Sequence, residues 1–202
     1  MMKQLSGLLL ICISLILVGC APRQPAIMLP NNQVTTWPLR QQALMRINNW
    51  QINGAVAIRT PQKALSASIN WLQQGACCYQ LHLFGPLDIG AISLIGSSYE
   101  IILKESNGKI YTASNPEQLL QTQLGWQLPL TNLYYWVRGL PAPGISATTT
   151  FDKFNHLSSL QQQGWQINYL SYTSVGKNDL PSKIFMQNGA ISVRLIISQW
   201  QL

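Results

Sequence analysis

The sequence predicts a mainly β protein of the α+β class, built on one strongly curved antiparallel sheet with a few short helices over its mouth. Ten or eleven short segments between Trp50 and Trp200 alternate apolar with polar or small residues, which is the period of a half-buried strand. Turn residues separate these segments, and only three stretches have the spacing of helices. A sheet of this size forms either an open or a closed barrel.

The first nineteen residues have the layout of a secretory signal. Lys3 supplies a positive start, an apolar run follows over 8–18, and Gly19 precedes Cys20. A membrane-spanning helix needs about 20 apolar residues, more than this run offers. The ending Leu-Val-Gly-Cys at 17–20 resembles the bacterial lipobox. This resemblance implies cleavage after Gly19 and acylation of Cys20. The alternatives are an ordinary cleaved signal with a chance cysteine and an uncleaved anchor.

The rest of the chain divides into a tether and one domain. Residues 20–36 hold the lipidated Cys20 and are rich in Pro, Gln and Asn, which is typical of a flexible tether. Residues 37–202 are long enough for a single domain with a full core. Two or more acyl chains anchor a protein stably to a bilayer. Ala21, rather than Asp, follows Cys20. By resemblance to lipoproteins of enteric bacteria, this predicts lipid anchoring in a Gram-negative outer membrane, facing the periplasm.

The charge pattern excludes one class of partner. The chain has 13 basic and six acidic residues and a formal net charge of +7, yet only 9% of its residues are charged. The basic residues form no cluster, so we expect no nucleic acid. The charge supports a mild attraction to anionic surfaces.

The first half of the domain reads as one helix and then strands. Thr36 and Pro38 favour a helix from Trp37 to about Asn48, with an apolar stripe at Leu39, Ala43, Leu44 and Ile47. The alternation then predicts strands over 50–58, 65–72, 79–84, 92–94, 99–103 and 110–113. Residues 60–63 connect the first two strands as a hairpin, and Asn107-Gly108 marks another hairpin turn.

The second half begins with two helices. Asn115 caps a helix that ends at Gly125, and a second helix over 130–138 is closed by 139–141. The alternation then resumes over 148–154, 157–163, 165–172, 184–187 and 191–200.

Cys77 and Cys78 are adjacent in a predicted strand. Neighbouring side chains in a strand point to opposite faces, so a disulfide between them would be strained. We therefore expect one buried cysteine and one surface thiol. There is no C-x-x-C spacing and no histidine partner that would indicate zinc.

The sequence offers little material for catalysis. The acidic residues form no spaced catalytic pair, His82 falls on the polar face of a strand, and His156 lies far from it in sequence. No hydrolase, zinc-protease or nucleotide-binding motif is present. We expect a protein that is not an enzyme, with no metal and no cofactor.

Large apolar side chains are the more distinctive feature. A curved sheet places such residues in a filled core or along a cavity. Strand parity and the predicted helices assign ten residues to the lining of such a cavity: Trp50, Ile52, Ile69, Trp71, Leu81, Leu83, Trp126, Leu133, Trp136 and Trp165. A packed core without a cavity is the alternative.

The loop after the third strand carries a second apolar feature. Pro86 ends the strand because it donates no ladder hydrogen bond, and Leu87 then falls at a turn. A single exposed leucine is common. At the tip of a hairpin, however, Leu87 could enter the acyl region of a bilayer.

The order and spacing of these landmarks resemble the LolB family, outer-membrane lipoprotein receptors of the Lol pathway of lipoprotein localisation. The matching pieces are Trp50–Ala57, Trp71–Gln74, Gly85–Leu87, Asn107–Ala113, Pro116–Leu120, Gly125–Leu130, Trp136–Pro141, Gln163–Tyr169, Leu180–Pro181 and Trp200. The resemblance covers Trp37 to the end, together with the lipobox. It implies an unclosed β-barrel of about eleven strands with a helical lid over an apolar cavity.

The resemblance also implies a function. Family members accept mature lipoproteins from a soluble, LolA-like periplasmic carrier and insert them into the outer membrane. The partners expected for this chain are therefore that carrier, lipoprotein acyl chains and the bilayer, and we expect a monomer. The family's loop leucine maps onto Leu87. Asp88 stands where the family often has Gly, which should make deep insertion harder.

Two other functions remain open from the residues alone. A structural or assembly outer-membrane lipoprotein would have a packed β core and no lipid cavity. A periplasmic hydrolase is the weaker alternative, because the catalytic residues are missing.

Overall fold

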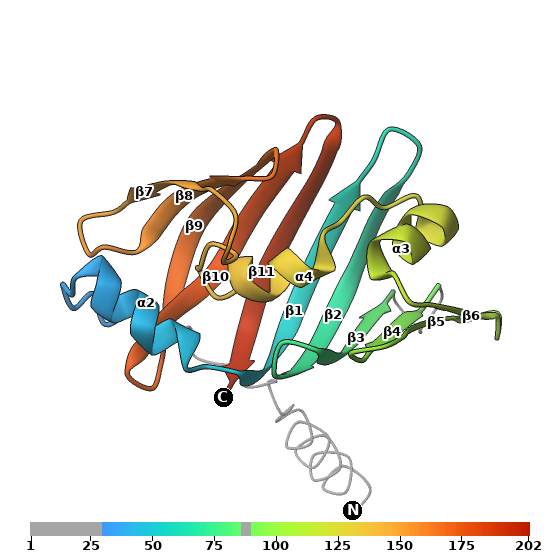
Figure 1. Ribbon diagram of the computed structural model, residues 1–202, viewed down its shortest axis with the longest axis horizontal. Helices are drawn as coiled ribbons and strands as arrows, with labels where there is room; N and C mark the ends of the chain where they lie inside the picture. Colours follow the sequence, from blue (N-terminus) through green and yellow to red (C-terminus); the bar gives the residue numbers. More distant parts are fainter. Residues whose placement is uncertain (1–29, 86–89) are drawn as a thin grey trace, which may run out of the picture.

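The computed structural model describes residues 30–85 and 90–202, which form one antiparallel sheet and three helices (Figure 1). The strands are β1 Asn49–Arg59, β2 Ala64–Gln74, β3 Cys78–Phe84, β4 Ile92–Gly96, β5 Ile101–Glu105, β6 Ile110–Ala113, β7 Thr148–Phe151, β8 Leu157–Gln162, β9 Trp165–Val175, β10 Asn178–Asn188 and β11 Ile191–Gln201. The helices are α2 Trp37–Met45, α3 Pro116–Leu124 and α4 Leu130–Trp136.

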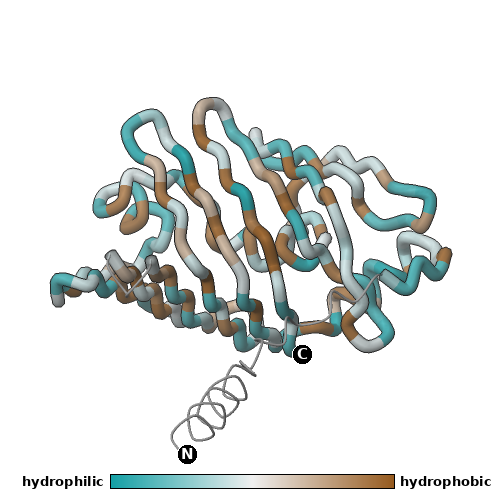
Figure 2. Tube along the Cα trace, turned by 180° about the vertical axis from the view of Figure 1, so that it is seen from behind, coloured by the Kyte–Doolittle hydropathy of each residue, from teal (hydrophilic) through white to brown (hydrophobic). Residues whose placement is uncertain are grey.

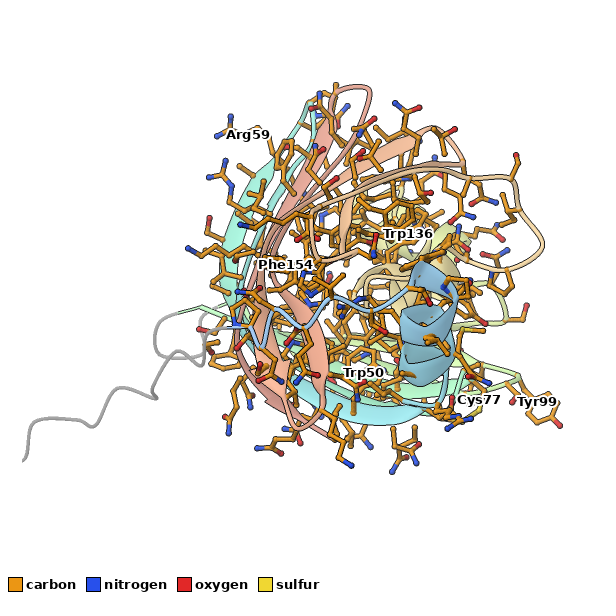
Figure 3. All side chains as sticks on the ribbon, turned by 90° about the vertical axis from the view of Figure 1, so that its left-hand side faces the viewer. Trp50, Arg59, Cys77, Tyr99, Trp136 and Phe154 are labelled. Atoms are coloured by element: carbon orange, nitrogen blue, oxygen red, sulfur yellow. A yellow bond between two sulfur atoms is a disulfide. The ribbon has the colours of Figure 1, made fainter. Side chains whose placement is uncertain are left out.

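The eleven strands are ordered β6-β5-β4-β3-β2-β1-β11-β10-β9-β8-β7, so the chain's first and last strands pair at the centre. β6 and β7 are the two edges and do not pair with each other, which leaves the barrel unclosed. Residues 114–147, here called the lid, connect one edge to the other and carry α3 and α4 across the concave face of the sheet (Figures 1 and 3). This confirms the predicted fold class.

The alternation of residue types explains the two faces of the sheet. In β1, Ile52, Val56 and Ile58 are buried on the concave side, here called the inner face, whereas Ala55 and Arg59 are exposed. Figure 2 shows the same change of polar and apolar residues along the central strands. Figure 3 shows Arg59 pointing away from the convex side, here called the outer face, and Trp50 and Trp136 on the inner side. The core therefore lies between the inner face and the lid.

A β-bulge increases the curvature at the centre of the sheet. The register between β1 and β11 shifts between Asn53 and Gly54. A Cβ at Gly54 would overlap the carbonyl group of Ile196, so only glycine permits this close approach of the two strands.

Helix α2 is shorter than predicted, and the face it buries agrees with the predicted stripe at Leu44 but not at Leu39. It ends at Met45, and Arg46 caps its end before β1 begins. Leu39, placed on the predicted apolar stripe, is 59% exposed, whereas Arg40 and Leu44 are buried. Arg40 donates to the carbonyl groups of Gln33 and Phe154, so hydrogen bonds as well as the core contacts of Leu44 orient this side of the helix.

Several strand boundaries also differ from prediction. β10 is more than twice the predicted length, because Pro181 lies inside it at a register shift, where a missing ladder donor is tolerated. Tyr99, predicted in a strand, is 88% exposed in the turn before β5. β7 ends at Phe151, three residues early, because Asp152 to Asn155 form a turn.

The helices of the lid are short. α4 ends at Trp136 instead of at 138, and Trp126 lies between α3 and α4 rather than within a helix. Within the described residues, none of the helices has the length and apolar character needed to cross a membrane.

Candidate functional site

The lid and the inner face enclose an apolar cavity of about 50 Å³. Side chains of β1–β4, β10 and β11 form its sheet wall, and α3, α4 and the segment between them form its cover. The lining residues are Val56, Ile58, Ile69, Trp71, Leu81, Leu83, Leu94, Leu120, Trp126, Leu128, Leu130, Leu133, Val137, Met186, Val193 and Leu195. Every one of these residues is apolar, so the cavity offers neither a catalytic group nor a polar anchor.

The structure buries all ten residues that the sequence assigned to a cavity. Six of them are among the lining residues: Ile69, Trp71, Leu81, Leu83, Trp126 and Leu133. The other four, Trp50, Ile52, Trp136 and Trp165, belong to the surrounding core. The same strand parity predicts further lining residues, such as Leu94 and Val193, that sequence reasoning did not name.

Two groups of aromatic side chains pack in the core around the cavity and are here called its frame. The ring of Trp50 lies 5.0 Å from that of Trp71 and 5.5 Å from that of Trp200, measured between centroids. On the other side, the rings of Trp136 and Trp165 are 6.1 Å apart. All five rings are buried, and their contacts add to the stability of the core on this face of the sheet.

The end of α4 is fastened to the sheet by hydrogen bonds. Trp136 donates from its indole N–H to Gln162 at 2.8 Å, and the Tyr169 hydroxyl donates to the Trp136 carbonyl at 2.9 Å. Gln162 also bonds both the N–H and the carbonyl of Ala142, just after α4. Burial raises the pKa of Tyr169 above its ordinary value, so this hydroxyl stays a donor. This end of the lid is therefore rigid.

Arg138 joins the lid to α2. Its guanidinium donates to the carbonyl groups of Tyr134, Leu44 and Ile47, and it lies 3.9 Å from the centre of the Tyr134 ring. The side chain is 1% exposed and has no carboxylate partner among the described residues. Burial lowers the pKa of Arg138, although an arginine keeps its charge. Carbonyl groups at the end of α2, the negative end of its dipole, replace the missing carboxylate.

Helix α3 is held differently. Asn115 caps it through the N–H of Gln118, and Gly125 ends it in the left-handed region at φ 73°. Leu119 and Leu120 are buried beneath it. Among the described residues, no hydrogen bond joins α3 to the sheet; Glu117 accepts one at 3.4 Å from Thr131 of the lid itself. α3 is therefore held mainly by apolar contact.

Outside the cavity, the structure brings together a polar cluster that the sequence did not predict. His156 is 1% exposed, with Nδ1 at 2.9 Å from Asp152 Oδ2 and Nε2 at 3.0 Å from Asp179 Oδ2. Each ring nitrogen of His156 therefore lies within hydrogen-bond distance of a carboxylate oxygen. Asp179 also accepts from the N–H of Asn31, which fastens the start of the described chain to β10. His156 and Asp179 are buried, whereas the Asp152 side chain is 36% exposed, and none of the three lines the apolar cavity.

Hydrogen bonds set the protonation of the two carboxylates. Burial alone would raise the pKa of Asp179, but the hydrogen bonds from Asn31, His156 and Ser174 outweigh it, so this pKa lies below its ordinary value. The pKa of Asp152 is lowered in the same way, against burial, by the backbone and ring of His156 and the N–H of Phe154.

The structure corrects the prediction for the two cysteines. Cys77 and Cys78 form a disulfide between neighbouring residues. Cys77 is exposed in the turn before β3 and Cys78 begins that strand. The prediction assumed that both residues lie in a regular strand, where their side chains diverge. The turn removes that restriction.

Three predicted site residues, Cys20, Pro86 and Leu87, lie outside the described residues. The described chain approaches the loop at Phe84 and Gly85, and Phe84 is 36% exposed. His82 is half-buried on the outer face. Over residues 30–85 and 90–202, no three His, Cys, Asp or Glu side chains are grouped as metal ligands.

The open sheet, the helical lid and the wholly apolar cavity between them define a lidded half-barrel. Solved structures share this fold at low sequence identity. A LolA superfamily protein from Nitrosomonas europaea matches with a TM-score of 0.55 at 10% identity, over 84% of this chain and 94% of that one. A putative outer membrane lipoprotein-sorting protein domain from Vibrio parahaemolyticus matches with a TM-score of 0.52 at 8% identity, over 82% and 90%. The chain therefore has a LolA-like fold.

Sequence comparison gives the family. The family described as outer membrane lipoprotein LolB matches residues 48–200. The outer-membrane lipoprotein LolB of Coxiella burnetii (strain RSA 493 / Nine Mile phase I) is 42% identical over 193 residues, 93% of this chain and 89% of the relative. That of Pseudomonas syringae pv. syringae (strain B728a) is 42% identical over 165 residues, 82% and 80% of the two chains.

This chain belongs to the LolB family of outer-membrane lipoproteins. It is thus an outer-membrane lipoprotein receptor of lipoprotein localisation and not an enzyme. The family, the location and the general function predicted from the sequence are confirmed.

Proposed function

We propose that the chain accepts the acyl chains of mature lipoproteins from a soluble, LolA-like periplasmic carrier in the cavity under its lid, and inserts them into the outer membrane. The observation that carries the proposal is the cavity, whose sixteen lining residues are all apolar and all buried between the sheet and the lid. Exposing acyl chains to water costs about 0.8 kcal/mol per CH₂, so a carrier must hide them throughout transfer.

The cavity must enlarge before it can hold such a ligand. Its volume of about 50 Å³ is little more than the share of one water molecule, about 30 Å³. Pockets for ligands of moderate size have about 300 Å³ or more. The structure therefore corresponds to a closed form, and acyl chains enter when part of the lid moves.

The moving part is α3 together with Trp126 and Leu128. These residues cover the cavity through apolar contacts. An acyl chain can replace those contacts with new apolar contacts at little cost in free energy. α4, by contrast, is fastened by Trp136 and Arg138. Within the moving part, Gly125 joins α3 to Trp126 at φ 73°, a backbone conformation that other residues rarely adopt.

Release then follows the free-energy gradient. No energy source is needed if each step moves the acyl chains to a more favourable apolar environment, from the carrier to this cavity and then to the bilayer. We assign Cys20 as the lipidated anchor after signal removal at 1–19, residues 20–36 as the tether, and Leu87, set by Pro86, as the residue that contacts the bilayer. The ten predicted lining residues supply the cavity and its frame.

The test uses a lipoprotein whose acyl chain carries a photoreactive diazirine. It is transferred from the carrier to the full chain, irradiated, and the attached residues are mapped by mass spectrometry. We expect attachment at lining residues such as Leu94, and none at its neighbour Ile95, which is 42% exposed on the outer face. Equal attachment at both, or none at the cavity wall, would favour the packed-core alternative of a structural or assembly lipoprotein.

A further inference from the structure

The outer face of the central sheet has an uneven charge. Strands β1, β2, β3 and β11 contain no Asp or Glu, and the one acid of β10, Asp179, is buried against His156. Arg59, Lys183 and Arg194 are exposed on these strands, and Lys63 is exposed in the β1–β2 turn. None of the four is paired with a described carboxylate. The face is therefore positively charged.

The strand register arranges the same face in rows. Ile196, Ala55, Ser68 and Phe84 are successive partners across β11, β1, β2 and β3, and Lys183 of β10 extends the row beyond Ile196. Two small side chains thus lie between two exposed apolar ones, since Ile196 is 41% and Phe84 36% exposed.

A second row runs beside the first. It places Arg194 beside Ala57 and Ser66, with the Arg194 guanidinium 5.9 Å from the centre of the Phe185 ring. Together the rows form a shallow groove of about 730 Å³ with a mostly apolar surface. Small residues at its centre let a flat surface approach the backbone closely.

Helices α3 and α4 lie on the inner side of the sheet (Figure 3), so in the described chain they leave this groove uncovered. Basic residues around exposed apolar groups are the composition of a surface that adsorbs to anionic lipid. The groove lies open along the exposed face of the sheet, so it does not surround a small ligand on all sides. The groove also ends at Phe84 and Gly85, directly before Pro86 and Leu87 in the sequence.

We propose that the outer face of β3-β2-β1-β11-β10 docks on the anionic surface of the bilayer that anchors the chain. This inference rests on the proposed anchoring and gives the domain an orientation. The lid, on the opposite side of the sheet, then faces the periplasm, where a carrier arrives. Phe84 and Ile196 contact the lipid, and Arg59, Lys183 and Arg194 face its phosphates.

The experiment uses the full lipidated chain in vesicles. A fluorophore is attached at Ser68→Cys, in the groove, or at the control Gln121→Cys, exposed on α3. Its quenching by iodide is compared in phosphatidylcholine vesicles and in equimolar phosphatidylcholine and phosphatidylglycerol. We expect shielding of position 68 in the anionic vesicles and none at position 121. A second chain with Arg59→Gln, Lys183→Gln and Arg194→Gln should lose this shielding, since each cation contributes about fivefold and the three together about 100-fold to adsorption.

Three results would overturn the inference: equal quenching of position 68 in both vesicles, shielding that persists in the triple variant, or shielding that develops only when a protein carrier is added. The unfolding midpoint of the triple variant checks that it remains folded. Acceptance of lipoprotein from the carrier is measured on the same samples. Normal acceptance without shielding would contradict the docking but not the proposed function. Shielding without acceptance would contradict the proposed function but not the docking.

Discussion

The guanidinium of Arg138 donates to the carbonyl of Ile47 at 2.6 Å, and this hydrogen bond connects the lid to the end of α2. The same guanidinium also donates to the carbonyls of Leu44 and Tyr134. One buried cation therefore joins α2 to α4, although Arg138 and Ile47 are 91 residues apart in the sequence. The lid is therefore rigid at α4 and free to open at α3.

Replacing this cation should destabilise the protein. Arg138→Met keeps much of the volume but removes the donor to the Ile47 carbonyl and the second donor to the Leu44 carbonyl, and we expect a loss of about 2–4 kcal/mol in the free energy of unfolding. Urea unfolding in detergent, followed by tryptophan fluorescence, measures it. Arg46→Met is the control, because Arg46 is exposed at the end of α2, and it should change stability by about 0.5 kcal/mol or less. Similar small losses in both variants would contradict the role of Arg138.

The β-bulge gives a second prediction. Gly54→Ala places a Cβ against the backbone carbonyl of Ile196, which cannot move without separating β1 from β11. Gly96→Ala meets only the ring of Tyr79, a side chain that can rotate away. We expect Gly54→Ala to cost about 3 kcal/mol and Gly96→Ala about 1 kcal/mol in chemical unfolding. The reverse order would show that the bulge does not depend on glycine.

Acid should weaken the attachment of residue 31 to the sheet. The folded pKa of Asp179 lies below its unfolded value, so the unfolded chain binds more protons and stability falls as the pH falls. The contribution is complete above about pH 5 and is lost as the pH drops through the lowered folded pKa. Unfolding midpoints of the wild-type chain and of Asp179→Asn, measured across this range, should converge at low pH. Parallel curves would mean that Asp179 contributes no pH dependence.

Leu87 separates two roles in one experiment. If Leu87 contacts the bilayer from a turn, Leu87→Glu should change the free energy of unfolding by about 0.5 kcal/mol or less. The variant should accept lipoprotein from the carrier normally but deliver it poorly to liposomes. Leu83→Glu is the matched control, because Leu83 is 3% exposed in the preceding strand and should lose several kcal/mol, about 3 or more. Normal delivery by a stable Leu87→Glu chain would exclude the assigned role.

Sequence patterns predicted the sheet well because alternation depends on neighbouring residues only. They failed where structure depends on distant ones. Pro181 concealed the first half of β10, since a proline is accepted there only because of a register shift against β9. In the cluster of His156 with Asp152 and Asp179, the first two are only four residues apart, but Asp179 comes from β10, 23 residues further along the chain.

The sequence could predict that the candidate site is an apolar cavity, but not the volume of that cavity. Parity identified the wall through residues such as Ile69 and Leu83. It could not show that Trp136 and Trp165 pack against each other in the core, or that Trp126 covers the cavity from a loop. Cavity volume is a small difference between the space inside the sheet and the side chains that fill it, and it depends on every side chain at once.

The stoichiometry of transfer tests the central claim most directly. A carrier loaded with one radiolabelled lipoprotein is mixed with the full chain in detergent, the complex is isolated, and liposomes are then added without nucleotide. The account predicts a one-to-one complex between the lipoprotein and this chain, followed by movement of the label into the liposomes. A lipoprotein that stays on the carrier, while the chain remains folded, would contradict the account.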